Sequence, residues 1–316
     1  MSTSSAVTLL NLTKRFGSLV AVDQLSFEVQ PGEIFGLVGP DGAGKTTTLR
    51  ILAGVLQADS GSVTMEGGDV LRDPEKAKHS LSYMPQRFGL YEDLTVDENI
   101  RFYADLFGVR SAQRERQSAK LLAAAGMSEF RKRLAGKLSG GMKQKLGLVC
   151  ALIHTPKVIL LDEPTTGVDP VSRRDFWKIL YGLALEGVTI LTSTAYLDEA
   201  ERCHRVALLH QGKLLFCDAP SLLKQHLEKQ VLAVSSAEPR KVRDALAGAE
   251  GVSTLVLRGD GVHAVVDDAN RRMPEFKSRL AATGAPFDEL VPTAPSMEDL
   301  FVELVTRKGG APGGTE

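Results

Sequence analysis

A run of eight residues early in the chain has the types and spacing that bind the phosphates of a nucleotide. It reads Gly39-Pro40-Asp41-Gly42-Ala43-Gly44-Lys45-Thr46, with glycine, lysine and threonine at the fixed places of a P-loop. Its glycines let backbone N–H groups close around a β-phosphate, and its lysine reaches the β- and γ-oxygens. The threonine hydroxyl can bind Mg²⁺. The run therefore predicts a nucleoside triphosphate site.

Two adjacent carboxylates form a second candidate for chemistry. Asp162 and Glu163 directly follow the apolar segment 158–161, which we expect to be a buried strand. One carboxylate at such a strand end can hold Mg²⁺, and its neighbour can polarise the attacking water in phosphoryl transfer. Two solvated acids at a strand end are the alternative. The P-loop in the same chain favours the catalytic interpretation.

A third candidate is the sequence Ser139-Gly140-Gly141, which precedes an apolar helical segment. The serine is a good helix N-cap. Two glycines weaken a helix unless something must approach its backbone closely, and an anion at a helix N-terminus is a natural ligand. The chain is therefore predicted to contain two anion-binding helix N-termini, although one nucleotide does not obviously need both.

Composition narrows the function further. The 316 residues include 38 Lys+Arg and 39 Asp+Glu, for a net charge of −1, so we expect no bulk attraction to nucleic acid. No apolar run approaches a membrane span, and the N-terminus lacks the features of a secretion signal. We therefore expect a chain that neither crosses a membrane nor is exported. Three scattered cysteines and six dispersed histidines favour neither disulfides nor a zinc site.

The elements that position these residues alternate between strands and helices. Residues 7–29 have the alternation of short strands, 34–38 form a buried strand, and a helix is expected from Lys45. With strands at 158–161 and 188–192, this predicts an α/β fold with a parallel-sheet core. Residues 86–140 contain helical patterns without a strand candidate, so we expect a helical insertion within an ATPase-type domain spanning 1–225.

A second, smaller domain is predicted over residues 226–308. Its expected order is strand, helix, hairpin, helix and strand, typical of a ferredoxin-like α+β module. A last helix is expected to begin at Ser296, with Asp299 completing a capping box. Residues 309–316 have a disordered composition. The individual predictions are strands at 231–234 and 287–291, helices at 240–247 and 274–283, and a turn at 259–261.

Together these motifs resemble the ATPase subunit of an ABC transporter, over residues 7 to 220. LSGGMKQK resembles the signature of that family, VILLDEP its Walker B segment, and Gln86 its Q-loop. Gly167-Val168-Asp169 is similar to the D-loop, and Phe16 to the aromatic residue that stacks on adenine. LSGGM in place of LSGGQ, and the C-terminal PSMEDLFVELV, resemble the ABC-2 branch, which exports drugs, antibiotics or lipids.

The resemblance implies two ATPase domains packed head to tail, with each ATP between the P-loop of one and the signature of the other. Gln86 would touch Mg²⁺ and link the site to the helical insertion, which would receive a membrane permease subunit. The chain would then be cytoplasmic and peripheral on the inner face of the membrane. Implied catalytic residues are Glu163, Lys45 and Gln86, and implied Mg²⁺ ligands are Thr46, Gln86 and Asp162. Implied ATP contacts are Phe16, Gly39, Pro40, Asp41, Gly42, Ala43, Gly44, Lys45, Thr46, Thr47, Ser139, Gly140, Gly141 and Asp169.

Two positions depart from the family pattern. Ala195 stands where the family has a switch histidine that contacts the γ-phosphate, so we expect slow hydrolysis at this chain's own site. The nearest histidine, His204, is expected on a helix and exposed, where it cannot substitute. Asp41 stands where asparagine is usual. Both features resemble the first half of tandem ABC-2 ATPases.

These departures leave two assemblies and two functions open. A heterodimer with a second, competent ATPase is favoured, and a homodimer that hydrolyses weakly through Glu163 is the alternative. The favoured function is a motor subunit for export, and the alternative is an ATP-binding regulatory subunit with little hydrolysis. An ABC protein of DNA repair or translation is disfavoured, because no long coiled coil fits between Lys45 and Ser139 and the chain has one ATPase unit.

Overall fold

The computed structural model describes residues 5–307, and the predicted tail, 309–316, lies outside them. The chain divides into two compact units between Cys217 and Asp218. The boundary was predicted later, after residue 225, whereas the short helix α8 (Pro220–Gln225) belongs to the second unit, where it packs against α11 (Met297–Arg307). Among the described residues, no helix combines the length and apolar character needed to span a bilayer.

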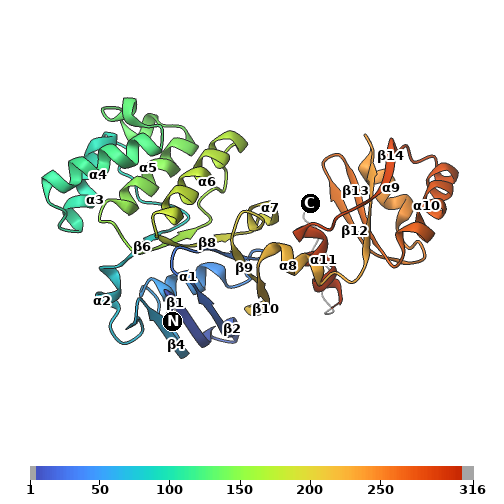
Figure 1. Ribbon diagram of the computed structural model, residues 1–316, viewed down its shortest axis with the longest axis horizontal. Helices are drawn as coiled ribbons and strands as arrows, with labels where there is room; N and C mark the ends of the chain where they lie inside the picture. The colour runs from blue at the N-terminus through green and yellow to red at the C-terminus, as the bar shows by residue number, and fades with distance from the viewer. Residues whose placement is uncertain (1–4, 308–316) are drawn as a thin grey trace. The chain divides into compact units, whose positions relative to one another are not determined.

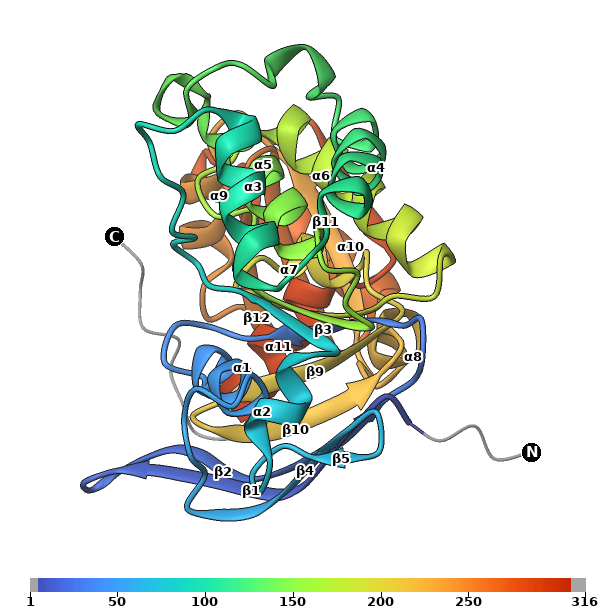
Figure 2. The ribbon, with the colours of Figure 1, turned by 90° about the vertical axis from the view of Figure 1, so that its left-hand side faces the viewer.

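The first unit contains an antiparallel sheet built from its N-terminal residues. Strands β1 (Val7–Phe16) and β2 (Leu19–Val29) form a hairpin, and β1 also pairs with β4 (Ser60–Met65). The short strand β5 (Gly68–Asp69) completes the order β2-β1-β4-β5. Side chains that alternate inward, such as those of Val7 and Leu9, are fully buried. This sheet is at the bottom of Figure 2.

A six-stranded sheet forms the centre of the first unit, in the order β10-β9-β3-β8-β7-β6. The neighbouring strands from β9 to β6 pair in parallel, so their carboxyl ends lie along one edge. Its apolar strands are buried on both faces, as the predicted α/β fold requires. The strands are β3 (Ile34–Val38), β6 (Leu81–Met84), β7 (Val158–Asp162), β8 (Thr189–Thr194), β9 (Arg205–His210) and β10 (Lys213–Asp218).

Helix α1 (Lys45–Leu52) lies between the two sheets (Figure 1), where Leu49, Ile51 and Leu52 are buried in a core shared with both. The other long helices gather on the opposite face of the six-stranded sheet. They are α3 (Val96–Leu106), α4 (Ser111–Ala124), α5 (Gly140–Leu152) and α6 (Pro170–Leu185), and the short helices of the unit are α2 (Pro74–Lys78) and α7 (Leu197–Ala200). Residues 86–139 contain α3, α4 and two short 3-10 turns, as expected of a helical insertion.

The second unit has the predicted β-α-β-β-α-β order. Its sheet runs β12-β13-β11-β14, with antiparallel neighbours, which is the arrangement of a split βαβ module. Helices α9 and α10 share one core with a face of this sheet. The elements are β11 (Gln230–Ser235), α9 (Pro239–Leu246), β12 (Val252–Arg258), β13 (Gly261–Val266), α10 (Ala269–Thr283) and β14 (Glu289–Thr293).

The helix predicted at 274–283 begins five residues earlier than expected. Asp268 caps it by accepting a hydrogen bond from the backbone N–H of Arg271, and Pro274 lies inside the helix rather than at its start. The predicted capping box of α11 is present, since Ser296 and Asp299 each accept a hydrogen bond from the other's backbone N–H. The last strand, predicted at 287–291, begins and ends two residues later, at Glu289 and Thr293.

Candidate functional site

The P-loop follows β3 and has the backbone that its glycines allow. Gly42 and Gly44 have φ values of +76° and +99°, in the left-handed region that glycine adopts without strain. A Cβ atom on Gly39 would lie 2.3 Å from the carbonyl oxygen of Leu209 in β9, so a side chain does not fit there. The N–H of Gly39 donates to the carbonyl of Thr194 at 3.3 Å, which ties the loop to the end of β8.

Lys45 begins α1 and its side chain folds back over the loop. Its Nζ atom donates to the carbonyls of Gly39 and Pro40, at 2.8 and 3.0 Å, and lies 3.4 Å from Oε1 of Glu163. The side chain is 4% exposed. No side chain caps α1, because Gly44 is its N-cap, so the first N–H groups of the helix remain available to an anion.

Asp162 ends β7 and is the acceptor at the centre of the site. Its Oδ1 atom accepts from the hydroxyls of Thr46 and Ser193, at 2.9 and 2.7 Å. Its Oδ2 atom accepts from the Tyr83 hydroxyl at 3.3 Å. Burial, and next the charge of Asp162, raises the pKa of Tyr83 to about 12, so this phenol remains a donor. The result is a buried carboxylate with a fixed orientation beside the hydroxyl of Thr46.

Glu163 follows Asp162 and points toward the Q-loop. Its φ is +47°, which is uncommon for a residue with a side chain. The amide of Gln86 donates to Oε2 of Glu163 at 2.9 Å, and Thr166 donates to the same oxygen at 3.4 Å. The contacts of Lys45, Thr46 and Gln86 with the two carboxylates bring all five residues predicted for catalysis and Mg²⁺ into one cluster.

Tyr83 and Ser193 are site residues that the sequence analysis missed. The hydroxyl of Ser193 donates to Asp162 and accepts from the backbone N–H of Glu163 at 2.9 Å, so it fixes both carboxylates. Each residue has a polar neighbour on its own strand, Ser82 on β6 and Thr192 on β8, and neither belongs to a spacing pattern that marks a site. Their place on strands next to β7 is the signal that could have identified them.

The residue that follows β8 is Ala195, and His204 does not replace the missing histidine in space. Ala195 is exposed, and the nearest histidine in sequence lies at the other edge of the sheet. The Nδ1 atom of His204 accepts from the N–H of Ile34, the first residue of β3, at 2.9 Å. The predicted helix around His204 was wrong, because it lies in a bend before β9; its exposure agrees with the prediction. Within residues 5–307, no hydrogen bond or ion pair joins His204 to the P-loop.

The signature segment lies at the N-terminus of α5. Ser139 accepts a hydrogen bond from the N–H of Met142 at 3.3 Å and so acts as the predicted N-cap. A Cβ on Gly140 would meet nothing within 4 Å, whereas one on Gly141 would lie 2.6 Å from Ser172. The two glycines therefore differ: the first leaves the backbone open, and the second lets α5 pack against α6.

The remaining predicted contacts lie at three separate places. Phe16 ends β1 and is 50% exposed, and Asp41 is exposed in the P-loop. Asp169 caps α6 by accepting from the N–H of Ser172 at 2.9 Å. Among residues 5–307, no hydrogen bond or ion pair joins residues 139–141 to the P-loop, so within one chain these two predicted phosphate contacts remain unconnected.

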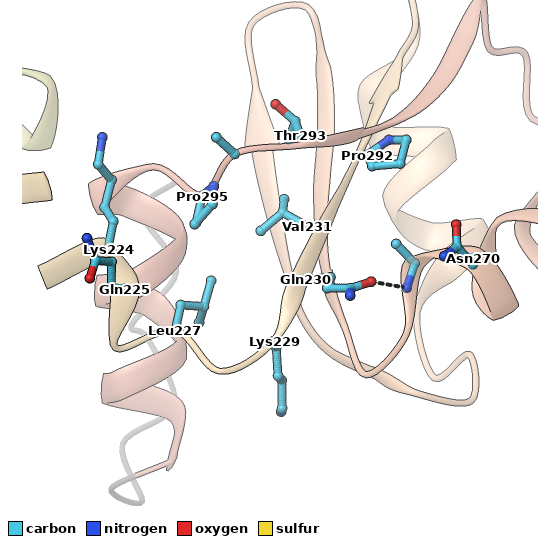
Figure 3. A pocket seen from close by; sticks show the side chains of 12 residues that line it. Lys224, Gln225, Leu227, Lys229, Gln230, Val231, Asn270, Pro292, Thr293 and Pro295 are labelled. Carbon is cyan, nitrogen blue, oxygen red and sulfur yellow. Dashed lines mark hydrogen bonds between the residues drawn. The ribbon is translucent and has the colours of Figure 1, made fainter. Parts of the chain in front are cut away.

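A cavity of about 580 Å³ in the second unit offers a different candidate site (Figure 3). Two of its polar side chains already stabilise the fold. Lys229 pairs with the buried Glu303 at 2.9 Å, and Gln230 accepts from the N–H of Ala269 at 2.7 Å. With Leu227 and Val231 among its walls, this cavity contains no arrangement comparable to the cluster around Asp162.

Known proteins that are similar to this chain belong to the family that the site residues indicate. The family described as ABC transporter matches residues 22–166. The Nod factor export ATP-binding protein I of Burkholderia thailandensis is 36% identical over 93% of this chain and 95% of its own length. This chain belongs to the ATP-binding subunits of ABC transporters. The recognition of this family, and of an ABC-type ATPase domain, from the sequence is thereby confirmed.

Other relatives of this ABC subunit extend the comparison. The probable multidrug ABC transporter ATP-binding protein YbhF of Escherichia coli is 44% identical over 97% of the chain, which spans 53% of the length of YbhF. A solved ATP-binding subunit of an ABC transporter superposes with a TM-score of 0.64 and 28% identity, over 70% of this chain and 93% of that one. The predicted ABC ATPase fold is therefore confirmed.

Proposed function

We propose that this ABC subunit hydrolyses ATP to power an ABC-2 type exporter. The observation that carries the proposal is the cluster in which Lys45 meets Glu163 while Thr46 meets Asp162, all at the carboxyl edge of the parallel sheet. Nucleotides bind at this edge in open α/β sheets. The names of the relatives, multidrug transporter and Nod factor export protein, support export.

The chain's own contacts to ATP follow from the P-loop and its neighbours. The open N–H groups at the start of α1 and the Nζ atom of Lys45 bind the phosphates. Without a nucleotide, this Nζ atom donates to the carbonyls of Gly39 and Pro40 instead. Phe16 supplies an exposed ring for adenine. The full P-loop set is Gly39, Pro40, Asp41, Gly42, Ala43, Gly44, Lys45, Thr46 and Thr47.

Mg²⁺ fits the donor set beside the P-loop. The hydroxyl of Thr46, the carboxylate of Asp162 and the amide oxygen of Gln86 are oxygen ligands, which this hard cation prefers. Thr46 and Asp162 are already within 2.9 Å of each other. When bound, Mg²⁺ would neutralise charge that develops on the phosphate oxygens.

Glu163 is the residue best placed to act as general base. Gln86 donates to Oε2, Lys45 faces Oε1, and Ser193 holds the backbone N–H, so the carboxylate is oriented from three sides. An oriented carboxylate can accept a proton from the attacking water. Gln86 connects this carboxylate to the start of the helical insertion, so it can report the state of the site to a membrane permease bound there.

A second ATPase subunit completes the site. The open N-terminus of α5, with Ser139 and Gly140, has no bond to the chain's own P-loop, which supports its use by the nucleotide of a partner. Ala195 cannot contact a γ-phosphate, so hydrolysis at this chain's own site is slow. We favour a heterodimer with a competent ATPase, in which this chain's signature completes the faster site; a homodimer is the alternative.

The assembly would place this chain on the inner face of the cell membrane, bound to a permease, where ATP is present. The alternative function is an ATP-binding regulatory subunit with little hydrolysis, and Ala195 is the observation that favours it. In both cases the exported compound meets the permease rather than this chain. For the second unit, residues 226–308, we favour a role in dimerisation.

Phosphate release separates the two functions. We expect Ala195→His to raise the hydrolysis rate of the purified chain, assayed without a second ATPase, by up to about 10²-fold, because it restores one donor to the γ-phosphate. Equal rates with and without histidine would contradict the assigned role of position 195. Affinity purification from membranes tests the partners: a second ATPase and a permease are expected, and recovery of a permease with this ATPase alone would favour the homodimer.

A further inference from the structure

The ring of Phe16 has a cation against one face. The Nζ atom of Lys14 lies 5.5 Å from the ring centroid, within the range in which an ammonium and an aromatic ring attract each other. The two residues are two positions apart on β1, so their side chains leave the same face of the strand. Half of Phe16 remains exposed, which leaves surface for a ligand.

Asp59, in the segment before β4, fixes the position of this cation. Its Oδ1 atom is 3.0 Å from Nζ of Lys14, and its Oδ2 atom accepts from the N–H of Arg15 at 2.6 Å. The N–H of Asp59 donates to the carbonyl of Thr13 at 2.9 Å. One aspartate therefore binds each of the three residues that precede Phe16.

Burial strengthens the contact between the ammonium and the ring. The side chain of Lys14 is 13% exposed, so it is partly removed from water, and cation–π attraction is stronger where the cation is desolvated. Hydrogen bonds from Arg15 and Lys14 lower the pKa of Asp59, so this carboxylate remains ionised and keeps its partner. Phe16 is thus a supported ring rather than a loose surface side chain.

We propose that Lys14 and Asp59 are positioning residues for recognition of the nucleotide base. Asp59 holds Lys14 behind Phe16, and the cation draws π-electron density to its own side of the ring. The opposite face becomes less negative and stacks more strongly on an electron-rich purine. The inference rests on the proposed ATP site and adds to it the residues that tune its preference for a base.

A change at Lys14 should alter the binding of the base and leave the binding of the phosphates unchanged. Lys14→Met removes the charge but keeps much of the apolar stem, so the chain's affinity for the non-hydrolysable imido analogue of ATP should fall about threefold to tenfold. Its affinity for inorganic tripolyphosphate, which has no base, should not change. Lys14→Arg should restore most of the affinity for the analogue, and Asp59→Asn should lower it less than Lys14→Met does.

Isothermal titration calorimetry on the full chain with Mg²⁺ measures both ligands. Lys78→Met is the matched control, because it removes a lysine that pairs with Glu75 on α2 and should change neither affinity. Phe16→Ala should reduce the affinity for the imido analogue toward that for tripolyphosphate. Thermal unfolding of each variant shows whether it retains the fold. If Lys14→Met does not fold, Lys14→Arg and Asp59→Asn still test the proposal.

The outcomes are distinguishable. An unchanged ratio of the two affinities in Lys14→Met, or a rise in affinity for the ATP analogue, would overturn the proposal while leaving the ATP site intact. Equal affinities of the wild-type chain for both ligands would overturn the base platform as a whole. We expect Lys45→Ala to lose affinity for both ligands. We expect Lys14→Met to lose affinity only for the ATP analogue.

Discussion

Two helix N-termini in the first unit have similar sequences of small residues but different environments. At α1 the N-cap is Gly44, and no side chain occupies the first N–H groups. Lys45 and Thr46 at this end contact the carboxylates of Glu163 and Asp162. At α5 the side chain of Ser139 already accepts a hydrogen bond, and neither carboxylate of the cluster lies there. We therefore assign the proposed nucleotide site to the first end, whereas the second end has no catalytic side chains of the cluster beside it.

The difference shows why a glycine-rich helix start is insufficient to define a catalytic site. Both ends offer a positive dipole end and open backbone. What separates them is the tertiary neighbourhood, because the strands β7 and β8 bring Asp162, Glu163 and Ser193 to α1 alone. The side chains that we propose for catalysis therefore lie at the sheet edge, and the helix end has the open N–H groups that suit an anion.

The largest expected effect tests the α1 end. Lys45→Ala should reduce phosphate release by the purified chain, assayed without a second ATPase, by roughly 10²- to 10³-fold, since it removes a preorganised cation from the phosphates. The control is Lys143→Ala in α5, which removes a surface ion pair with Glu92 and should have little effect. Wild-type rates in Lys45→Ala would contradict the assignment of the catalytic end to α1.

Ser193→Ala sharpens the role of the sheet edge. It leaves the N–H of Glu163 without its acceptor and removes one donor to Asp162, so the free energy of unfolding should fall by about 1–3 kcal/mol. The Mg²⁺ concentration needed for half-maximal hydrolysis should rise. Denaturant unfolding and a Mg²⁺ titration measure these effects. The control is Ser82→Ala, which changes a buried serine on β6. An equal rise in the half-maximal Mg²⁺ concentration in this control would contradict the role of Ser193.

The adjacent glycines of α5 should respond in opposite ways. Gly141→Ala forces a Cβ against Ser172 and should destabilise the fold by about 1–3 kcal/mol. Gly140→Ala meets open space and should stabilise the helix by about 0.5–1 kcal/mol. Denaturant midpoints check both values. If Gly140→Ala nevertheless slows hydrolysis in the assembly, a partner's phosphate approaches this backbone; unchanged hydrolysis would count against that approach.

The smallest effect concerns a third helix N-terminus, that of α6. Hydrogen bonds from Ser172 lower the pKa of Asp169 below its usual 3.8, so the folded state favours the ionised form. This stabilisation is present above pH 4 and is lost as the pH falls through the lowered value. Melting temperatures of wild type and Asp169→Asn should therefore converge in acid. A difference that is constant with pH would argue against an ionised cap.

Much of the first unit could be predicted because its chemistry depends on fixed spacing. The P-loop, the carboxylates after the strand at 158–161 and the serine before α5 are each specified by neighbours in sequence. Tyr83 and Ser193 could not be predicted in this way, since their role arises only when parallel strands align their ends. The same is true of Gly141, whose need for a small residue comes from Ser172.

In the second unit the order of elements was predictable and the start of one helix was not. Proline is common in the first turn of a helix, so Pro274 suggested a start. The structure instead begins α10 at Ala269, because Asp268 supplies a cap and Gln230 accepts the bond of the first N–H. A local preference for proline was overridden by a capping residue and by a long-range contact.

Ser139 and Asp169 accept the same kind of bond from the start of their helices, but they differ in what they have left over. A carboxylate has no proton to offer, so Asp169 can present only negative charge to its surroundings. A hydroxyl that accepts inward can still donate outward. Serine at position 139 can therefore cap its helix and still donate a hydrogen bond to an anion, which the ionised carboxylate of Asp169 cannot do.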